Sequence, residues 1–115
     1  MSENCLFCKI GTGAIPSQKI FENEKVFGFV DIHPQAKTHL LFVHKTHTSN
    51  INDMSKDSTA IAEVFQAIAE YTKDKDLSTD GFRVVTNLGP NAGQTVFHTH
   101  FHVVGGEPLG HFGRR

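Results

Sequence analysis

The sequence predicts an α+β fold in which one antiparallel sheet carries a long helix on one face. Segments rich in β-branched and aromatic residues mostly follow one another through short turns, which is typical of antiparallel strands. Only residues 56–74 repeat apolar side chains at the spacing of a long helical face. With 115 residues, no linker and no internal repeat, the chain is expected to form a single domain over residues 1–115.

The first half of the chain is predicted to contain one short helix and three strands. Residues 5–10 suit a helix that ends at the following Gly-Thr-Gly turn. Ser17 to Phe21 and Val26 to Ile32 read as strands joined by the turn of residues 22–24. Thr38 to His44 reads as a third strand, and Pro34 separates it from the second.

The second half is predicted to contain the long helix and two further strands. Ser55, Asp57 or Ser58 can cap the helix start. A strand from Phe82 to Asn87 follows the helix, and a polar loop over residues 88–94 leads to a strand with three histidines. The apolar face of the helix is formed by Ile61, Val64, Phe65, Ile68 and Tyr71.

The histidine strand is the strongest candidate for a functional site. His98, His100 and His102 alternate with other residues, so in a strand they would line one face. The row could be incidental surface histidines, but three imidazoles on one face make this the weakest interpretation. A second interpretation is a zinc site, because His-x-His is a good chelate. A third is nucleophilic catalysis by a neutral imidazole at a phosphoryl centre.

The loop before the histidines can receive a phosphate. Asn87, Gly93, Gln94 and Thr95 offer backbone N–H groups, amides and a hydroxyl, which suit phosphate oxygens and developing negative charge. Taken alone, the loop would be interpreted as an ordinary turn, because such loops are common. Asp31, at the end of a predicted strand, can accept the hydroxyls of a ribose or remain a solvated turn residue.

Two cysteines near the start have the spacing of half a zinc site. Cys5 and Cys8 would need two more ligands for a tetrahedral site, and His47 and His98 are the candidates. The alternative is that both are small buried hydrophobic residues. The sequence shows no export signal, so we expect reduced thiols and a cytoplasmic location.

The overall charge and hydropathy narrow the classes of partner. The net charge of −1 provides no general attraction for nucleic acid or anionic membranes. No apolar run approaches the roughly 20 residues of a membrane span. We therefore expect neither nucleic acid nor a membrane as a partner, and an anionic ligand would have to be held by local groups.

Several motifs in a fixed order resemble the histidine triad (HIT) superfamily, and in particular its Hint branch of purine nucleoside phosphoramidases. The family pattern alternates three histidines with apolar residues, and His98 to Val104 matches it with Thr99 as the one weak position. The resemblance extends over residues 5–110. The other matching segments are 7–10, 15–17, 29–32, 34–36, 38–40, 87–89, 93–97 and 105–110.

This resemblance implies a fold, an assembly and an activity. The fold would have a five-stranded antiparallel sheet, one long helix and a short N-terminal helix. Two chains would form a homodimer with a ten-stranded sheet. The protein would bind purine nucleotides and hydrolyse nucleoside 5′-phosphoramidates, in which AMP or GMP is linked to an amine. The reaction would pass through a covalent nucleotidyl-histidine and would need no cofactor.

The resemblance also implies roles for individual residues. His100 would be the nucleophile, His102 would bind the phosphate, and His98 and His39 would support and orient the cluster. Asp31 would hold the ribose, while Asn87, Gly93, Gln94 and Thr95 would contact the phosphate or the leaving group. The base would lie in an apolar slot formed by Phe7, Ile10, Phe29 and Ile32. Relatives with both cysteines can bind a structural zinc through residues that match Cys5, Cys8, His47 and His98.

Three alternatives remain open at this stage. The chain could be a dinucleoside polyphosphate hydrolase of the same superfamily, although Gly105-Gly106 favours the Hint branch. It could be a nucleotide-binding interaction module with vestigial activity. It could also be a zinc hydrolase, in which case chelation would abolish turnover, whereas a structural zinc is expected to affect stability alone. His44 stands where relatives often have a proline, and its role is open, as is that of His111.

Overall fold

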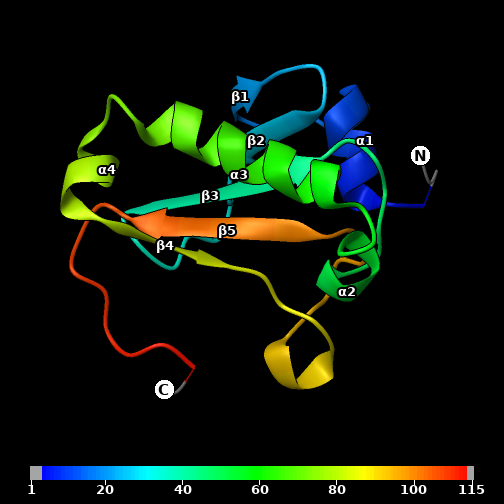
Figure 1. Ribbon diagram of the computed structural model, residues 1–115. Coiled ribbons are helices and arrows are strands. Elements are labelled where there is room, and N and C mark those ends of the chain that lie inside the picture. Colours follow the sequence, from blue (N-terminus) through cyan, green and yellow to red (C-terminus); the bar gives the residue numbers. More distant parts are fainter. Residues whose placement is uncertain (1–3, 114–115) are drawn as a thin grey trace.

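The computed structural model describes residues 4–113 and has the predicted α+β architecture (Figure 1). A single antiparallel sheet has the strand order β1-β2-β3-β5-β4, so β3 and β5 lie at its centre. The five strands are β1 (Lys19–Glu22), β2 (Val26–Val30), β3 (Thr38–His44), β4 (Phe82–Val85) and β5 (His100–Gly105).

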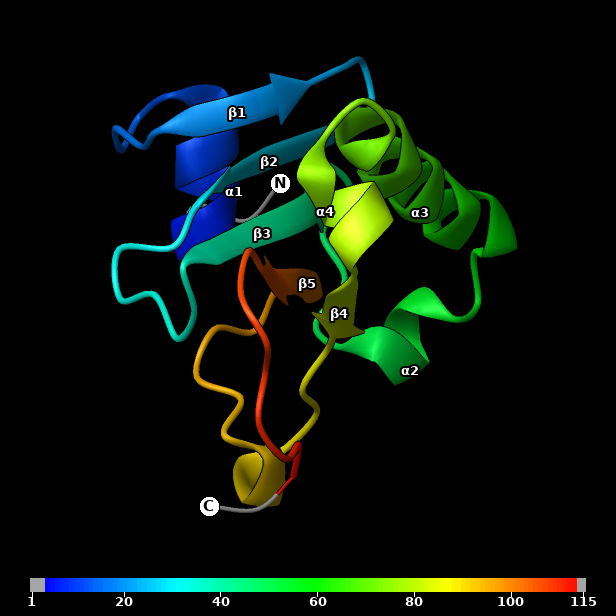
Figure 2. The same cartoon turned by 90° about the vertical axis from the view of Figure 1, so that its left-hand side faces the viewer.

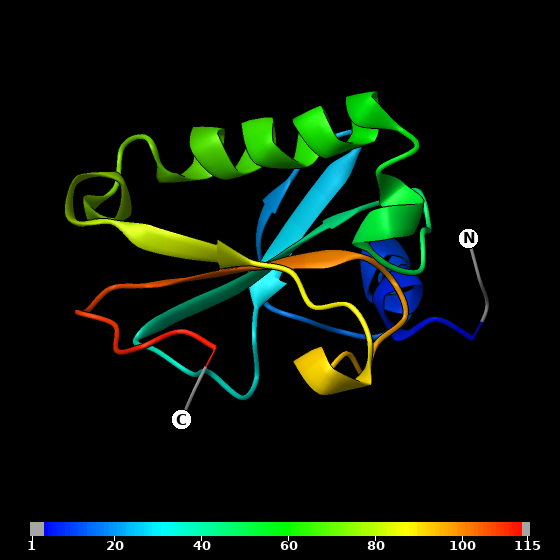
Figure 3. The same cartoon turned by 60° about the horizontal axis from the view of Figure 1, so that its bottom comes forward.

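The helices lie on both sides of this sheet. Figure 2 shows α1 and α3 on opposite sides, and Figure 3 shows α3 lying along the strands. None of the helices within residues 4–113 combines the length and the apolar character needed to cross a membrane. The helical elements are α1 (Leu6–Thr12), α2 (Ile51–Met54), α3 (Ser58–Thr72), α4 (Asp76–Asp80) and the 3-10 turn η1 (Pro90–Ala92).

The register between β3 and β5 decides which side of the sheet the histidines face. His100 pairs with Val43 and His102 pairs with Leu41. Directly paired residues of antiparallel strands share a face, so both histidines point to the side that carries α1. The alternating residues of β5, Phe101 and Val103, face α3 instead.

Two apolar clusters hold the layers together. The larger cluster lies between the sheet and α3, and the smaller one lies between the sheet and α1. Burying roughly ten apolar side chains at about 1.5–3 kcal/mol each makes the α3 side the main source of stability. The α1 side has fewer apolar residues because it also holds the histidines. Its buried members are Cys5, Phe7, Cys8, Ile10, Phe27, Phe29, Leu41 and Val43.

Most predicted elements are present, and the long helix is capped as expected. The Asp57 side chain accepts a hydrogen bond from the Ala60 N–H (3.0 Å) at the start of α3. Gly13 follows α1 with a φ of +86°, which favours glycine and ends the helix. The short helices α2 and α4 and the turn η1 were not predicted. The predicted strands 17–21, 26–32 and 82–87 are shifted or shortened by two residues at most at either end.

The prediction that all three histidines belong to one strand is wrong for His98. β5 begins at His100, so His98 precedes the sheet. The backbone at this point is bonded elsewhere, because the Thr99 N–H donates to the Thr48 carbonyl (2.8 Å) instead of to a neighbouring strand. The Thr48 and Thr99 hydroxyls also bond to each other (2.7 Å). His98 is therefore held by the segment that follows β3.

The turn after β5 provides a test of the backbone geometry. Gly106 has a φ of +82°, and a Cβ added there would lie 2.7 Å from the Thr38 Oγ1. Gly106→Ala should lower the free energy of unfolding by about 1–3 kcal/mol, as measured by chemical denaturation. Gly110→Ala is the matched control, because a Cβ there meets no atom within 4 Å. Equal stability of the two variants would contradict this account of the turn.

Candidate active and metal sites

A cleft of about 370 Å³ opens on the α1 side of the sheet. It brings together His100, His102 and Thr95, from one segment near the end of the chain, and Asp31, which follows β2. The predicted apolar slot is present in the same cleft. Its lining includes Phe7, Ile10, Phe29 and Ile32, together with Leu41 and Val96, which the sequence analysis did not identify.

The ring of His100 is fixed by a backbone hydrogen bond. Its Nδ1 lies 2.8 Å from the His98 carbonyl oxygen, which can only accept, so Nδ1 carries the proton. In a neutral imidazole the other nitrogen then has an unprotonated lone pair. Phe7 packs edge-on against the ring, with 4.8 Å between the ring centroids. Nε2 of His100 is therefore the group with nucleophilic character.

A chain of hydrogen bonds fixes the second histidine of the cleft. The Gln35 backbone N–H donates to the Nδ1 of His39 (2.9 Å), so the proton of a neutral His39 is on Nε2. That Nε2–H donates to the Nδ1 of His102 (2.8 Å). The proton of His102 is consequently on its own Nε2. Asp31 lies beside this chain, with its Oδ2 3.4 Å from the His39 Nε2.

Burial keeps these rings neutral. It lowers the pKa of His102 to about 4, with the neighbouring His100 and His39 acting in the same direction. Burial also lowers the pKa of His100, against its hydrogen bond to His98 and the charge of Asp31. For His39, burial again lowers the pKa and Asp31 opposes the effect. The ring of His39 is therefore neutral at pH 7 where it contacts Asp31. The proton positions assigned to His100, His39 and His102 apply at this pH.

Four side chains form a compact cluster beside the cleft. The Nδ1 of His98 lies 3.3 Å from the Cys5 Sγ and 3.4 Å from the Cys8 Sγ. The Nδ1 of His47 lies 3.1 Å from that of His98 and 3.4 Å from the Cys8 Sγ. The predicted set of Cys5, Cys8, His47 and His98 is therefore brought together, and it could bind a metal such as zinc.

The cluster also meets the chemical requirements of a metal site. Tetrahedral zinc with sulfur and nitrogen ligands separates its ligand atoms by about 3.3–3.8 Å, close to the spacings here. His98 is fully buried, and its Nε2 donates to the His44 carbonyl (2.8 Å), which leaves the Nδ1 lone pair directed at the cluster. Burial lowers the pKa of His98 to about 4, so that lone pair is available at neutral pH.

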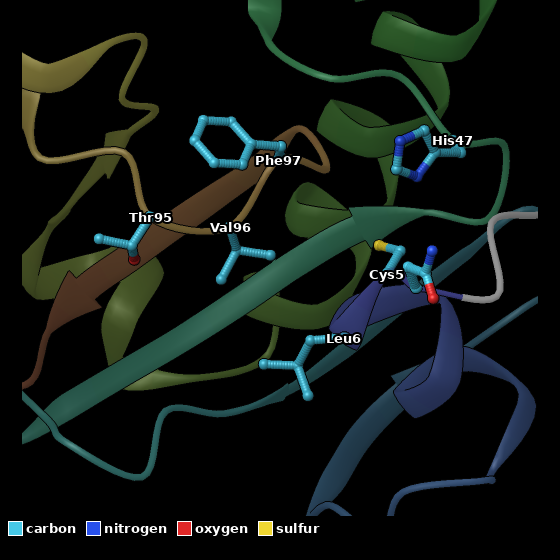
Figure 4. Close-up of a pocket in the computed structure, with 7 residues that line it drawn as sticks. Cys5, Leu6, His47, Thr95, Val96 and Phe97 are labelled. Carbon is cyan, nitrogen blue, oxygen red and sulfur yellow. The ribbon is translucent and has the colours of Figure 1, made fainter.

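A second cavity, of about 440 Å³, gives access to the cluster. Figure 4 shows Cys5 and His47 at one end of it and Thr95, Val96 and Phe97 toward the other. Leu6, Thr95 and Val96 line this cavity as well as the cleft, so these three residues separate the two spaces. Cys5 and His47 therefore border a cavity other than the cleft.

The loop residues predicted to contact phosphate lie in different places. Thr95 lines the cleft, whereas Asn87 lines a separate cavity of about 220 Å³ with His39 and His102. The side chain of Gln94 is bonded to backbone groups, accepting from the Gly89 N–H (3.0 Å) and donating to the Ser49 carbonyl (2.8 Å). Gln94 shapes the loop in this way. A direct contact of Gln94 or Gly93 with phosphate stays a prediction.

His44 is buried, a placement that the sequence did not reveal. Its Nδ1 accepts from the Thr46 N–H (3.0 Å), and its Nε2 bonds to the Glu63 Oε1 (2.9 Å) on α3. Its carbonyl holds the ring of His98. His44 thus connects α3 to the segment that carries His47 of the cluster. A glutamate on the side of α3 that lies against the sheet would have indicated this burial. Identifying that side requires the strand order of the sheet.

The neutral state of His102 makes the stability of the fold depend on pH. The pKa of this ring is about 4 in the folded protein and about 6.5 in an unfolded chain, so the unfolded chain binds more protons between these values. The free energy of unfolding should decrease as the pH falls from about 6.5 to about 4. Chemical denaturation at a series of pH values measures this. His102→Gln should show a smaller decrease in this window, and parallel curves would contradict the assignment.

Comparisons with known proteins identify the family of this chain. The HIT domain model matches residues 12–109. A purine nucleoside phosphoramidase of Escherichia coli (strain K12) is 34% identical over 111 residues, which cover 96% of this chain and 93% of that protein. A HIT family hydrolase from Legionella pneumophila Philadelphia 1 has a similar structure, with 41% identity, a TM-score of 0.88, and coverage of 93% and 96%.

A histidine triad protein from Clostridium difficile aligns over still more of the chain. It is 35% identical with a TM-score of 0.92, and the alignment covers 97% of this chain and 98% of that one. These findings confirm the resemblance seen in the order of the sequence motifs. By the family match over residues 12–109 and the similarity along nearly its whole length, the chain belongs to the HIT domain family.

Proposed function

We propose that this protein hydrolyses purine nucleoside 5′-phosphoramidates with His100 as the nucleophile. The observation that carries the proposal is the tautomer of His100. Its Nδ1–H is bonded to a carbonyl, so an unprotonated Nε2 belongs to a ring that lines a cleft of nucleotide size. The E. coli relative that bears the name purine nucleoside phosphoramidase supports the choice of substrate.

The chemistry proceeds in two displacements at phosphorus. The His100 Nε2 attacks the α-phosphorus, the P–N bond breaks, and the amine leaves with a proton taken from solvent. Water then attacks phosphorus and returns a proton to solvent, the bond to His100 breaks with its electron pair returning to Nε2, and the nucleoside monophosphate is released. The His102 Nε2–H is a donor for a phosphate oxygen, because the chain from Gln35 through His39 keeps the proton on that nitrogen.

Two further features of the cleft, a carboxylate and an apolar slot, favour a nucleotide as the ligand. Asp31 lines the cleft next to the histidines, where its carboxylate can accept hydrogen bonds from the ribose hydroxyls. The apolar residues beside it provide a slot for a purine ring, which gains affinity from apolar burial. Such a slot has few polar groups to read the base edges, so we expect adenine and guanine nucleotides both to bind.

A hydrolytic metal in the cleft is disfavoured by the same hydrogen bonds. Asp31, His39 and His102 are close enough together to suggest a cation site. However, the His39 Nε2 that would face the cation carries a proton, because its Nδ1 accepts from the Gln35 N–H. A protonated nitrogen is no ligand, so we assign these three groups to proton positioning.

We assign a structural zinc to Cys5, Cys8, His47 and His98. Two thiolates and two neutral imidazoles are a common structural zinc set, and the four ligands leave no open position for substrate. The ligands come from three distant parts of the chain, so a bound cation would join the start of α1 to both segments beside the cleft.

The homodimer stays a prediction. The sheet ends in β1 and β4, and β4 exposes Val84 and Val85.

Replacing the nucleophile should abolish turnover and spare binding. His100→Ala should reduce kcat for an AMP phosphoramidate with a fluorogenic amine by at least 10³-fold, because no covalent intermediate can form. AMP affinity, measured by calorimetry, should change far less. His111→Ala removes an exposed histidine and serves as the control. Unchanged turnover by His100→Ala would exclude the mechanism. Hydrolysis of diadenosine triphosphate instead, or AMP binding without turnover of either compound, would favour the alternative functions.

The cluster should contain one metal ion that supports the fold. Purified protein should hold close to one equivalent of zinc by elemental analysis, and Cys8→Ser should lose most of it. Removing the metal should lower the melting temperature, because the cation holds segments that are otherwise distant in the chain. Ser17→Ala changes a residue of the cleft outside the cluster and should keep the metal. Full metal content in Cys8→Ser would contradict the ligand assignment.

A further inference from the structure

A single residue, His98, belongs to both sites. Its side chain provides a ligand of the four-residue cluster, with Nδ1 3.3 Å from the Cys5 Sγ. Its backbone carbonyl accepts the Nδ1–H of His100 at 2.8 Å. Because this residue is fully buried, its ring and its carbonyl cannot move independently to any great extent. The position of the ring therefore determines where the acceptor for His100 lies.

The sheet does not hold that acceptor in place. β5 begins at His100, so the carbonyl of His98 lies before the regular strand pairing. The neighbouring Thr99 is bonded to Thr48 through its backbone and its hydroxyl. Thr48 directly follows His47, which is the ligand in the middle of the chain. Thr48, which holds the backbone beside His98, thus belongs to the segment of His47. A cation bound in the cluster would fix that segment.

The Nδ1 side of the His98 ring has a strong attachment only if the cluster binds a cation. Its Nε2–H is used by the His44 carbonyl, and its Nδ1 is a pure acceptor. Thiols of Cys5 and Cys8 are weak donors, and the ring of His47 is a third donor for the same lone pair. A cation would replace these interchangeable contacts by bonds of fixed length and direction.

A second connection runs through α1. Both cysteines are at the start of this helix, and the Cys8 N–H donates to the Cys5 Sγ at 3.3 Å. Between them lies Phe7, which packs edge-on against the ring of His100. Fixing the two sulfur atoms therefore also fixes the aromatic ring that limits the movement of His100 on the cleft side.

We propose that the cation held by Cys5, Cys8, His47 and His98 is a positioning device for His100, acting through the carbonyl of His98 and the ring of Phe7. This proposal rests on the proposed function of His100. It goes beyond the expectation that the metal affects stability alone, because it assigns to the cluster an effect on kcat in fully folded protein. The cation takes no part in the chemical step.

The test uses His47→Ala, which removes one ligand of the cluster and keeps Cys5, Cys8 and His98. The full-length variant is assayed well below its melting temperature, where it is folded. Its kcat should fall about 10- to 100-fold, the size of effect common for groups that orient a reactive side chain. KM for the AMP phosphoramidate should change less than about threefold, since the phosphate and ribose contacts remain.

A second readout does not depend on activity. Long-range ¹H–¹⁵N spectra of the imidazoles report which nitrogen of His100 is protonated. Wild-type protein with zinc should show the Nδ1–H form alone, and His47→Ala should show a mixture of both tautomers. Removing zinc from the wild type should produce the same mixture, and adding zinc back should reverse it. This measurement decides the proposal even if the phosphoramidate proves not to be a substrate.

Two further variants separate positioning from stability. Val64→Ala removes two methyl groups from the fully buried core on the α3 side and should lower the stability while leaving kcat and the His100 tautomer unchanged. His47→Cys keeps a metal ligand and should retain both zinc and most of the turnover. Loss of zinc in His47→Ala with unchanged kcat and a pure Nδ1–H tautomer would overturn the proposal. An equal fall of kcat in Val64→Ala would do the same.

Discussion

The pairing of β3 with β5 is the constraint on which the rest of the structure depends. It places His100 opposite Val43 and His102 opposite Leu41, and a slip of one residue would turn both histidines toward α3. The apolar residues of both strands oppose such a slip, because Phe42 and Phe101 fill the core on the α3 side. The same core that stabilises the sheet thus selects the face on which the chemistry takes place.

Burial and hydrogen bonding act together on the histidines. Removing the rings from water disfavours their charged forms, while backbone groups at His98 and Gln35 fix which nitrogen carries the proton. The side chains therefore present one lone pair at His100 and one donor at His102. Neither ring needs a carboxylate as its primary partner, and Asp31 remains available to a ligand.

The sequence predicts the local elements well and the long-range ones poorly. β3 has the predicted bounds because a continuous apolar run follows Pro34, and α3 is identified by its periodicity. The helices α2 and α4 have four and five residues, too few to establish a period. The strand order and the end of β5 depend on contacts between residues far apart in the chain. For this reason His98 was wrongly included in the strand.

The candidate site could be predicted residue by residue because a family resemblance accompanied the chemistry of its side chains. The sequence did not reveal the hydrogen-bond partners of Gln94 and His44, because packing brings those partners near. The Gln94 amide satisfies its hydrogen bonds on the backbone of Gly89 and Ser49, and its contact with phosphate stays a prediction. The role of His44 was open in the sequence, and the approach of Glu63 on α3 accounts for its buried position.

The bond between His44 and Glu63 has a consequence for how the molecule opens. It joins a helix on one side of the sheet to the segment that carries His47 and supports His98 on the other. We therefore expect fraying of α3 to remove support from that segment. The two layers should then open together in native-state hydrogen exchange, with similar protection of the cleft and of the core.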